Sequence, residues 1–257
     1  MTSNSSVKQS LNDQNIDILT GGSGDPLVVF HHDIGNPGWL PFYDKLADKF
    51  SVYVPLMPGF GTSDRPDWMR SVRDMATLCQ WLLREMNLEQ KPYIVGLGFG
   101  GWVAAEMATT GSDNIRGMSL VNPMGLQPRE GEIMDQFLVS SEQYIKTGFN
   151  DLTTYHQTFG DLPDVEQLVA WEINREMTTR IAWKPYMFDR SLENLLRAVD
   201  TPTQLISGSN NRIVPPVCCD QFAELIPGSK VFDIEDCGHY ADIEKPDELA
   251  KLILDFY

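Results

Sequence analysis

Short runs of β-branched and other apolar residues alternate along the chain with longer stretches whose apolar positions recur every three or four residues. The short runs predict strands near residues 26–31, 51–55, 92–96, 117–122, 203–207 and 230–234. The longer stretches predict helices that begin near Trp39, Val72, Gly101, Val217 and Pro246. Strands that alternate with helices are typical of an α/β protein with a mostly parallel central sheet flanked by helices.

This alternation stops once, between residues 123 and 200, where helical patterns continue without strand signals. The pattern predicts a core made of residues 15–122 and 201–257, with residues 123–200 inserted as a helical cap and residues 1–14 as a flexible lead-in. Apolar pockets often form where such parts meet. We therefore expect His156, Trp183 and Tyr186 of the cap to line a substrate pocket, among many aromatic residues that form ordinary core.

Composition narrows the possible partners. The chain has 257 residues with 42% hydrophobic and 22% charged residues, the balance of an ordinary globular protein. A formal charge of -16 disfavours nucleic acid and anionic membranes. No apolar run is long enough to span a bilayer, no signal peptide is expected, and the four cysteines do not form zinc-type pairs. These features predict a reduced, cytoplasmic protein with a small-molecule partner, no metal or other cofactor, and a possible homodimer.

Four local motifs follow one another in a recognisable order. Residues 28–33 form a strand that runs into His-His-Asp, and residues 57–64 read Met-Pro-Gly-Phe-Gly-Thr-Ser-Asp. Residues 94–101 form a strand that opens into a glycine-rich turn and a helix. Near the C-terminus, residues 208–215 and the sequence Asp-Cys-Gly-His at 236–239 complete the series.

In order and spacing these motifs resemble the α/β-hydrolase fold superfamily over nearly the whole chain. The resemblance implies a catalytic triad, but Gly98 stands where the family's G-x-S-x-G turn carries the nucleophile, and Asn211 stands where it carries the acid. The alternative acid position after the strand near residue 122 is Asn122. Only the histidine position, His239, matches. The resemblance also implies an oxyanion hole formed by the backbone N–H groups of Asp33 and Phe99.

A glycine nucleophile position excludes a covalent acyl-enzyme through that residue, but leaves two functions open. The first is a noncanonical hydrolase or lyase that acts on a small apolar carbonyl compound, with His239 as base and the backbone oxyanion hole. The second is a non-catalytic small-molecule-binding pseudohydrolase, since the N-myc downstream-regulated proteins resemble this chain in having glycine at that position. His32, which stands where the family usually has glycine, is expected to contact the substrate.

Other residues leave further alternatives for the same site. Asp33, Asp220 or Asp242 could replace Asn211 as the acidic partner of His239. The histidines and Asp33 are metal-ligand types, but their spacing matches no known metal motif, and His31 is more typical of a buried structural histidine. Cys237 is expected to be an inert buried thiol.

Overall fold

The computed structural model describes residues 4–257, which form one eight-stranded sheet in the order β1-β2-β4-β3-β5-β6-β7-β8. The strands are β1 (Asn4–Leu11), β2 (Gln14–Gly21), β3 (Asp25–Phe30), β4 (Phe50–Pro55), β5 (Tyr93–Leu97), β6 (Gly117–Val121), β7 (Thr203–Gly208) and β8 (Lys230–Ile234). Strands β4, β3, β5, β6, β7 and β8 run parallel, whereas β2 pairs antiparallel with β1 and β4. All six predicted strands are present within one or two residues of their predicted limits.

The first two strands form a hairpin that the sequence analysis missed, so the prediction of a flexible lead-in over residues 1–14 is wrong from Asn4 onward; residues 1–3 lie outside the described part. Strand β1 is almost entirely exposed, and an exposed edge strand lacks the apolar alternation on which the prediction relied. The two-residue turn at Asn12 and Asp13 was the available signal, because Asn12 has a φ of 55° and asparagine is favoured in such hairpin turns.

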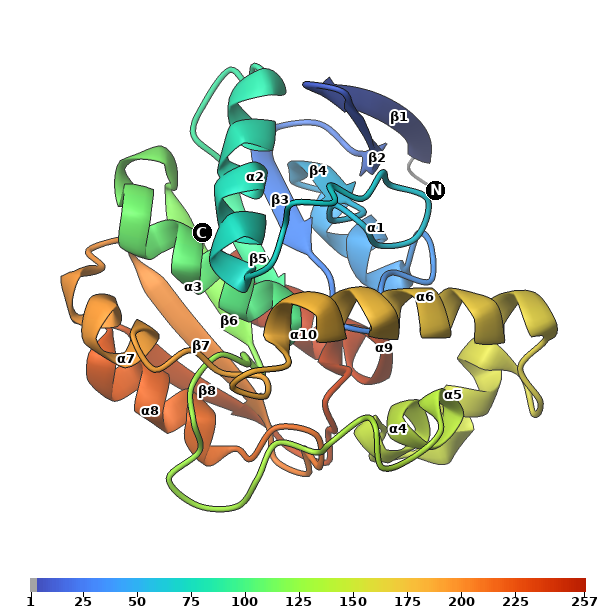
Figure 1. The fold of residues 1–257 in the computed structure, drawn as a ribbon. Helices are drawn as coiled ribbons and strands as arrows, with labels where there is room; N and C mark the ends of the chain where they lie inside the picture. The colour runs from blue at the N-terminus through green and yellow to red at the C-terminus, as the bar shows by residue number, and fades with distance from the viewer. Residues whose placement is uncertain (1–3) are drawn as a thin grey trace.

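Helices cover both faces of the sheet (Figure 1). Alternate residues of β3 point to opposite faces: Leu27 and Val29 pack in one cluster with α1 (Pro41–Ala47) and α10 (Pro246–Phe256). Val28 and Phe30 pack in the other cluster with α2 (Val72–Glu85), α3 (Phe99–Gly111) and α8 (Val217–Leu225). Burial of strands on both faces explains their continuous apolar runs.

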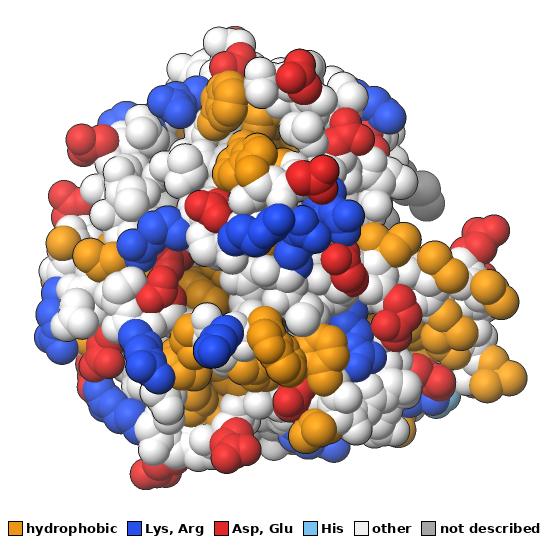
Figure 2. Space-filling model, in the orientation of Figure 1, with side chains coloured by type: hydrophobic (Ala, Val, Ile, Leu, Met, Phe, Trp, Pro, Cys, Tyr) orange, Lys and Arg blue, Asp and Glu red, His pale blue; other side chains and the backbone are white. Residues whose placement is uncertain are grey.

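The segment between β6 and β7 contains α4 (Ser141–Gly148), α5 (Leu152–Phe159) and α6 (Val165–Ala182), followed by the short helix α7 (Leu192–Leu195) and the 3-10 turn η2 (Leu196–Ala198). A second 3-10 turn, η1 (Ser112–Asn114), follows α3. Helices α4, α5 and α6, called here the helical insertion, lie together at one end of the molecule (Figure 1). This end of the molecule exposes many apolar side chains (Figure 2), including Val165 of α6, which is 75% exposed, and Leu162 in the loop before it, which is 85% exposed.

The helical insertion is fastened to the loop after β3. The Asn174 side chain in α6 donates a hydrogen bond to the carbonyl of Ile34 (2.7 Å) and accepts one from the N–H of Gly61 (3.0 Å). The Thr178 hydroxyl donates to the carbonyl of Asp33 (3.1 Å). Helix α6 therefore covers the carboxyl end of β3, where open α/β sheets place their ligand sites. Among residues 4–257, no helix is long and apolar enough to cross a membrane.

Candidate active site

Gly98 forms the sharp turn between β5 and α3. Its φ of 53° and ψ of -108° lie in a backbone region that residues other than glycine rarely adopt. A Cβ atom at this position would lie 2.7 Å from Nε2 of His239 and 2.7 Å from Nδ1 of His32. The turn therefore brings two imidazole rings together over a backbone position that carries no side chain.

His239 lies in the loop between β8 and the short helix α9 (Ala241–Glu244) and is completely buried. Its N–H donates to the carbonyl of Gly148 (2.6 Å), which links this loop to α4. Burial, and next the nearby His32, hold the pKa of the His239 ring well below its usual range. The Nε2 atom faces Gly98 and has no hydrogen-bond partner among residues 4–257. At neutral pH the ring is therefore neutral and one of its nitrogens is free for a ligand.

Asn211 determines which ring nitrogen of His239 carries the proton. Its Oδ1 accepts the N–H groups of Ile213 (3.0 Å) and Val214 (3.1 Å), so its amide nitrogen is the atom that faces the ring. That Nδ2 lies 3.2 Å from His239 Nδ1. An amide nitrogen can only donate, so Nδ1 accepts and the proton of the neutral ring resides on Nε2. This corrects the sequence-based expectation for His239: the ring presents a donor to the site, whereas a base must present a lone pair.

Asn122, at the alternative acid position, has a structural role. Its amide nitrogen donates to the carbonyls of Gly238 (3.2 Å) and His239 (3.0 Å), and its Oδ1 accepts the N–H of Gly208 (2.9 Å). These bonds connect the ends of β6 and β7 to the loop that carries His239. Asn122 thus fixes the position of the His239 backbone.

His32 and Asp242 form a buried pair that the sequence analysis did not identify. His32 Nε2 lies 2.9 Å from Asp242 Oδ1, and both side chains are 3% exposed. Asp242 was expected as a possible partner of His239, but it contacts the other ring. The Tyr240 ring packs edge-on against His32, with ring centroids 4.9 Å apart. The two residues of the pair are 210 positions apart in the chain, so no local motif signals them.

Asp33, predicted to supply an oxyanion-hole N–H, carries a buried carboxyl group. Its Oδ2 accepts a hydrogen bond from the Tyr144 hydroxyl (2.8 Å), and Oδ1 has no partner among the described residues. Burial raises the pKa of the Asp33 carboxyl; the Tyr144 bond, the nearby His32 and the backbone N–H groups of Asp33 and Ile34 act in the opposite direction. The Asp33 N–H is therefore close to its own carboxyl group. Phe99 begins α3, and first-turn N–H groups have no partner within their helix.

A small cavity lies beside Asp33 under the helical insertion. It is lined by Ile34, Tyr144, Ile145, Trp171 and other neighbours. Its free volume of about 10 Å³ is enough for about one water molecule. In this closed arrangement a larger ligand needs the insertion to move away from the loop after β3.

The three aromatic or imidazole residues expected to line a substrate pocket lie in different surroundings, and only Tyr186 is near the Asp33–Tyr144 pair. His156, in α5, is partly exposed, and its Nδ1 lies 3.2 Å from Asp161. Trp183 is 52% exposed and packs against Phe137. The Tyr186 hydroxyl donates to the carbonyl of Met134 (2.9 Å) and accepts the N–H of residue 136 (2.9 Å). Aromatic composition alone gave these positions, and it does not specify which side of a helix faces the core.

The remaining polar candidates are structural. His31 Nδ1 donates to the carbonyl of His32 (2.7 Å), while its Nε2 accepts the N–H of Met57 (3.0 Å). Burial and the nearby His32 ring lower the pKa of His31 to about 4, with burial the larger cause. The hydrogen bond to the His32 carbonyl acts in the opposite direction. Cys237 is buried, and burial raises its thiol pKa. Within residues 4–257, no group of three or more metal-ligating side chains is placed to hold an ion.

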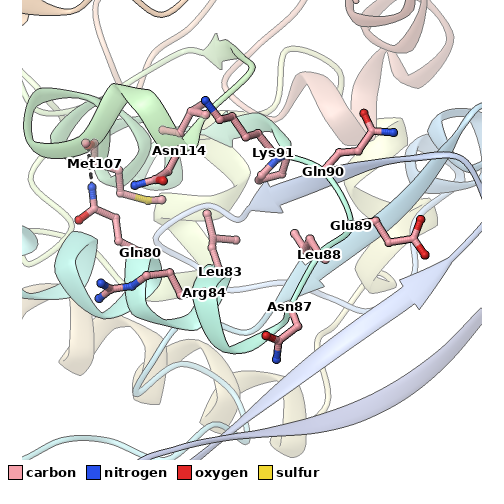
Figure 3. A pocket seen from close by; sticks show the side chains of 13 residues that line it. Gln80, Leu83, Arg84, Asn87, Leu88, Glu89, Gln90, Lys91, Met107 and Asn114 are labelled. Atoms are coloured by element: carbon pink, nitrogen blue, oxygen red, sulfur yellow. Dashed lines mark hydrogen bonds between the residues drawn. The ribbon is translucent and has the colours of Figure 1, made fainter.

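A larger surface pocket of about 410 Å³ lies away from this site (Figure 3). It is formed by the end of α2, the loop that leads into β5 and the end of α3, and includes Arg84, Asn87 and Lys91. This pocket adjoins the start of β5, whereas Gly98 follows its end. Since ligand sites in open α/β sheets lie beyond the carboxyl ends of the strands, the Gly98 region is the better candidate.

The sequence was compared with protein families and with known proteins. Residues 28–252 match the model of the alpha/beta hydrolase family. The chain is 25% identical to a 2-hydroxy-6-oxo-6-(2'-aminophenyl)hexa-2,4-dienoic acid hydrolase of Metapseudomonas resinovorans, over 93% of this chain and 86% of that protein. It is 27% identical to monoacylglycerol lipase abhd6-B of Xenopus laevis, over 85% of this chain and 70% of the lipase.

Solved structures agree on the fold. A serine hydrolase involved in carbazole degradation superposes with a TM-score of 0.81 at 22% identity, covering 99% of this chain and 98% of that one. A meta-cleavage product hydrolase from Pseudomonas fluorescens IP01 gives a TM-score of 0.82 at 20% identity, covering 97% and 96% of the two chains. These matches confirm the predicted fold class.

Proposed function

Because the chain belongs to the alpha/beta hydrolase family, we propose that it is a noncanonical hydrolase or lyase-type enzyme that processes a small apolar carbonyl substrate without a covalent serine. In this proposal Gly98 and Asn211 occupy the nucleophile and acid positions of a degenerate triad, and His239 is its retained histidine. Water replaces the missing serine hydroxyl as nucleophile. The carbonyl oxygen is held by backbone N–H groups near Phe99 and Asp33.

One observation carries the proposal: Nε2 of a fully buried His239 has no hydrogen-bond partner among the described residues and is directed at Gly98, which carries no side chain. A buried polar atom without a partner is unfavourable by about 1–3 kcal/mol. A protein that needed only the scaffold would be more stable with an apolar residue there. A ligand oxygen beside Gly98 would satisfy the ring nitrogen.

The substrate class follows from the surroundings. Ile34, Ile145 and Trp171 line part of the small cavity next to the site, together with polar residues such as Asp33 and Tyr144. In the proposal, an apolar group of the substrate contacts these three side chains when the helical insertion moves away from the loop after β3. The similar proteins reported above are named as hydrolases of a dienoic acid and of monoacylglycerols. These names support an ester, lactone or β-diketone as the reacting group.

The proposal is tested by incubating the purified protein with activated esters, lactones and β-diketones that carry aryl or short alkyl groups. Turnover that disappears in His239→Ala and persists in His156→Ala supports an enzyme, because the second histidine is partly exposed and lies on α5. If the native chain turns over no compound but binds one of them by calorimetry, the proposal fails and the protein is a small-molecule-binding pseudohydrolase.

A further inference from the structure

The His32–Asp242 pair is a second histidine–carboxylate arrangement in the same site as His239. Asp242 is buried, and a buried carboxylate needs a hydrogen-bond donor. His32 Nε2 supplies that donor at 2.9 Å. A carboxylate only accepts, so the proton of a neutral His32 ring resides on Nε2 and its Nδ1 keeps a lone pair.

The two rings therefore present opposite chemistry to one point. His32 Nδ1 and His239 Nε2 are both buried and both lack a partner among the described residues. Each lies 2.7 Å from the position that a Gly98 Cβ would occupy. The first is an acceptor because Asp242 holds the proton on the far nitrogen, and the second is a donor because Asn211 donates to its far nitrogen. An acceptor and a donor that converge beside Gly98 are suited to an oxygen atom of a bound ligand that both gives and receives a hydrogen bond.

From this geometry, and resting on the proposed function, we infer that His32 is the general base of the site and that Asp242 is its positioning residue. His239 is then a neutral hydrogen-bond donor to the substrate oxygen, a role in which a neutral imidazole can polarise a carbonyl. Asn211 gives His239 an amide partner and no carboxylate. Asp242 provides the carboxylate of the site, and its partner is His32.

For an ester, the reaction begins with the attack of water on the carbonyl carbon. As the oxygen of water bonds to the carbonyl carbon, its proton passes to His32 Nδ1 and the carbonyl π electrons move to the carbonyl oxygen. That oxygen accepts hydrogen bonds from His239 Nε2–H and the Phe99 N–H. The carbonyl then re-forms, the bond from carbon to the leaving oxygen breaks, and His32 returns the proton to that oxygen. The products are a carboxylic acid and an alcohol, and the protein is unchanged.

The decisive variants exchange each histidine for glutamine, whose amide can donate a hydrogen bond but cannot act as a base at neutral pH. We expect His32→Gln to lower kcat by about 10³-fold or more, in the range of general-base removal. His239→Gln should retain kcat within about tenfold, since losing an oxyanion donor outright costs about 10²-fold. His156→Gln is the matched control and should leave kcat unchanged.

Asp242→Asn tests the positioning role. Removing the charge behind a catalytic histidine lowers kcat about 10⁴-fold in a serine protease, and a loss of similar size is expected here with KM nearly unchanged. Asp242→Glu, which keeps the carboxylate, should recover part of the rate. A purely structural role would reduce the amount of folded protein and leave kcat per folded molecule intact.

The proton position on His32 can be measured without turnover. Long-range ¹⁵N–¹H correlation spectra of the native protein should show neutral His32 protonated on Nε2 and bare on Nδ1. Protonation on Nδ1 overturns the inference whatever the activity. Turnover that survives His32→Gln but is lost in His239→Gln overturns it and leaves the proposed function intact. Absence of turnover from the native chain refutes both.

Discussion

Introducing a serine at residue 98 should destabilise the protein, because two imidazole rings already occupy the space around that position. A Cβ there would lie 2.7 Å from ring nitrogens of both His32 and His239, closer than real Cβ contacts. Overpacking of this kind costs about 1–3 kcal/mol. The φ of 53° adds about 1 kcal/mol for a residue other than glycine. Gly98→Ser should therefore lower the free energy of unfolding by about 2–4 kcal/mol.

Gly228→Ser is the matched control. Gly228 also has a positive φ, 74°, but an added Cβ would meet no atom within 4 Å. Its substitution should cost only the backbone strain, about 1 kcal/mol. Both variants are compared with the native chain by urea unfolding at neutral pH, and equal losses in Gly98→Ser and Gly228→Ser would refute the argument from crowding.

A double-mutant cycle separates the crowding by His32 from other effects. His32→Gly alone should destabilise, because it leaves the buried Asp242 carboxylate without its donor. Adding Gly98→Ser to that background should cost less than adding it to the native chain, by about 1 kcal/mol or more, since residues in contact couple by this amount. Additive losses would show that His32 does not occupy the space of the serine side chain.

Three further predictions concern the surroundings of the site. Asn211→Asp should raise the pKa of His239, because a carboxylate beside the ring favours its charged form, and a ¹H–¹⁵N NMR titration measures it. Lowering the pH from 7 to 5 should destabilise the protein by about 2 kcal/mol through His31, whose pKa of about 4 keeps the folded ring neutral while the unfolded ring takes up a proton below about 6.5. This contribution to the free energy of unfolding is fully present above pH 6.5 and is lost as the pH falls toward 4. Urea unfolding of the native chain and of His31→Gln at several pH values measures it. Tyr144→Phe should lower the free energy of unfolding by about 1–3 kcal/mol and raise the Asp33 pKa further, because it removes the hydroxyl that donates to that buried carboxyl.

Each of these predictions has a control within the chain. Asn210→Asp places the same charge on the neighbouring exposed residue and should shift the His239 pKa much less; equal shifts contradict the first prediction. His156→Gln should keep the native pH dependence. His31→Gln should lose its own part and keep the part due to His239, whose pKa burial also lowers; an undiminished pH dependence in His31→Gln contradicts the second prediction. Tyr155→Phe removes a buried hydroxyl that has no hydrogen-bond partner among the described residues and should cost little, so an equal loss from both tyrosines would contradict the third.

The sequence predicted the sheet well because buried parallel strands leave continuous apolar runs. Residues 93–97 and 117–121 are buried throughout, and both strands fall where the pattern placed them. The exposed strand β1 leaves no such run and was missed. Motif order was equally informative for the turn at Gly98 and for the loop that carries His239, because local backbone geometry dictates both.

The chemistry of the site was less predictable, because it depends on pairings between distant residues. Nothing in the sequence distinguishes Asp242 from Asp33 or Asp220 as the partner of a histidine, and only the fold shows that Asp242 contacts His32. The proton position on His239 depends on the two backbone N–H groups that hold the Asn211 amide in one orientation. For His156 and Trp183, composition suggested a pocket, whereas the structure leaves both side chains partly exposed to solvent.

The unusual residues at positions 32 and 98 are two parts of one arrangement. The resemblance to α/β-hydrolases implies glycine at the first position and a nucleophile at the second, whereas this chain has an imidazole at the first and no side chain at the second. The geometry makes these two differences interdependent, since His32 Nδ1 lies where a side chain at position 98 would have to pass. A glycine that had merely lost its hydroxymethyl group would leave a gap; here the gap holds a buried ring fixed by Asp242. The site is thus rebuilt around His32, and its function must be sought in what two facing imidazoles can do.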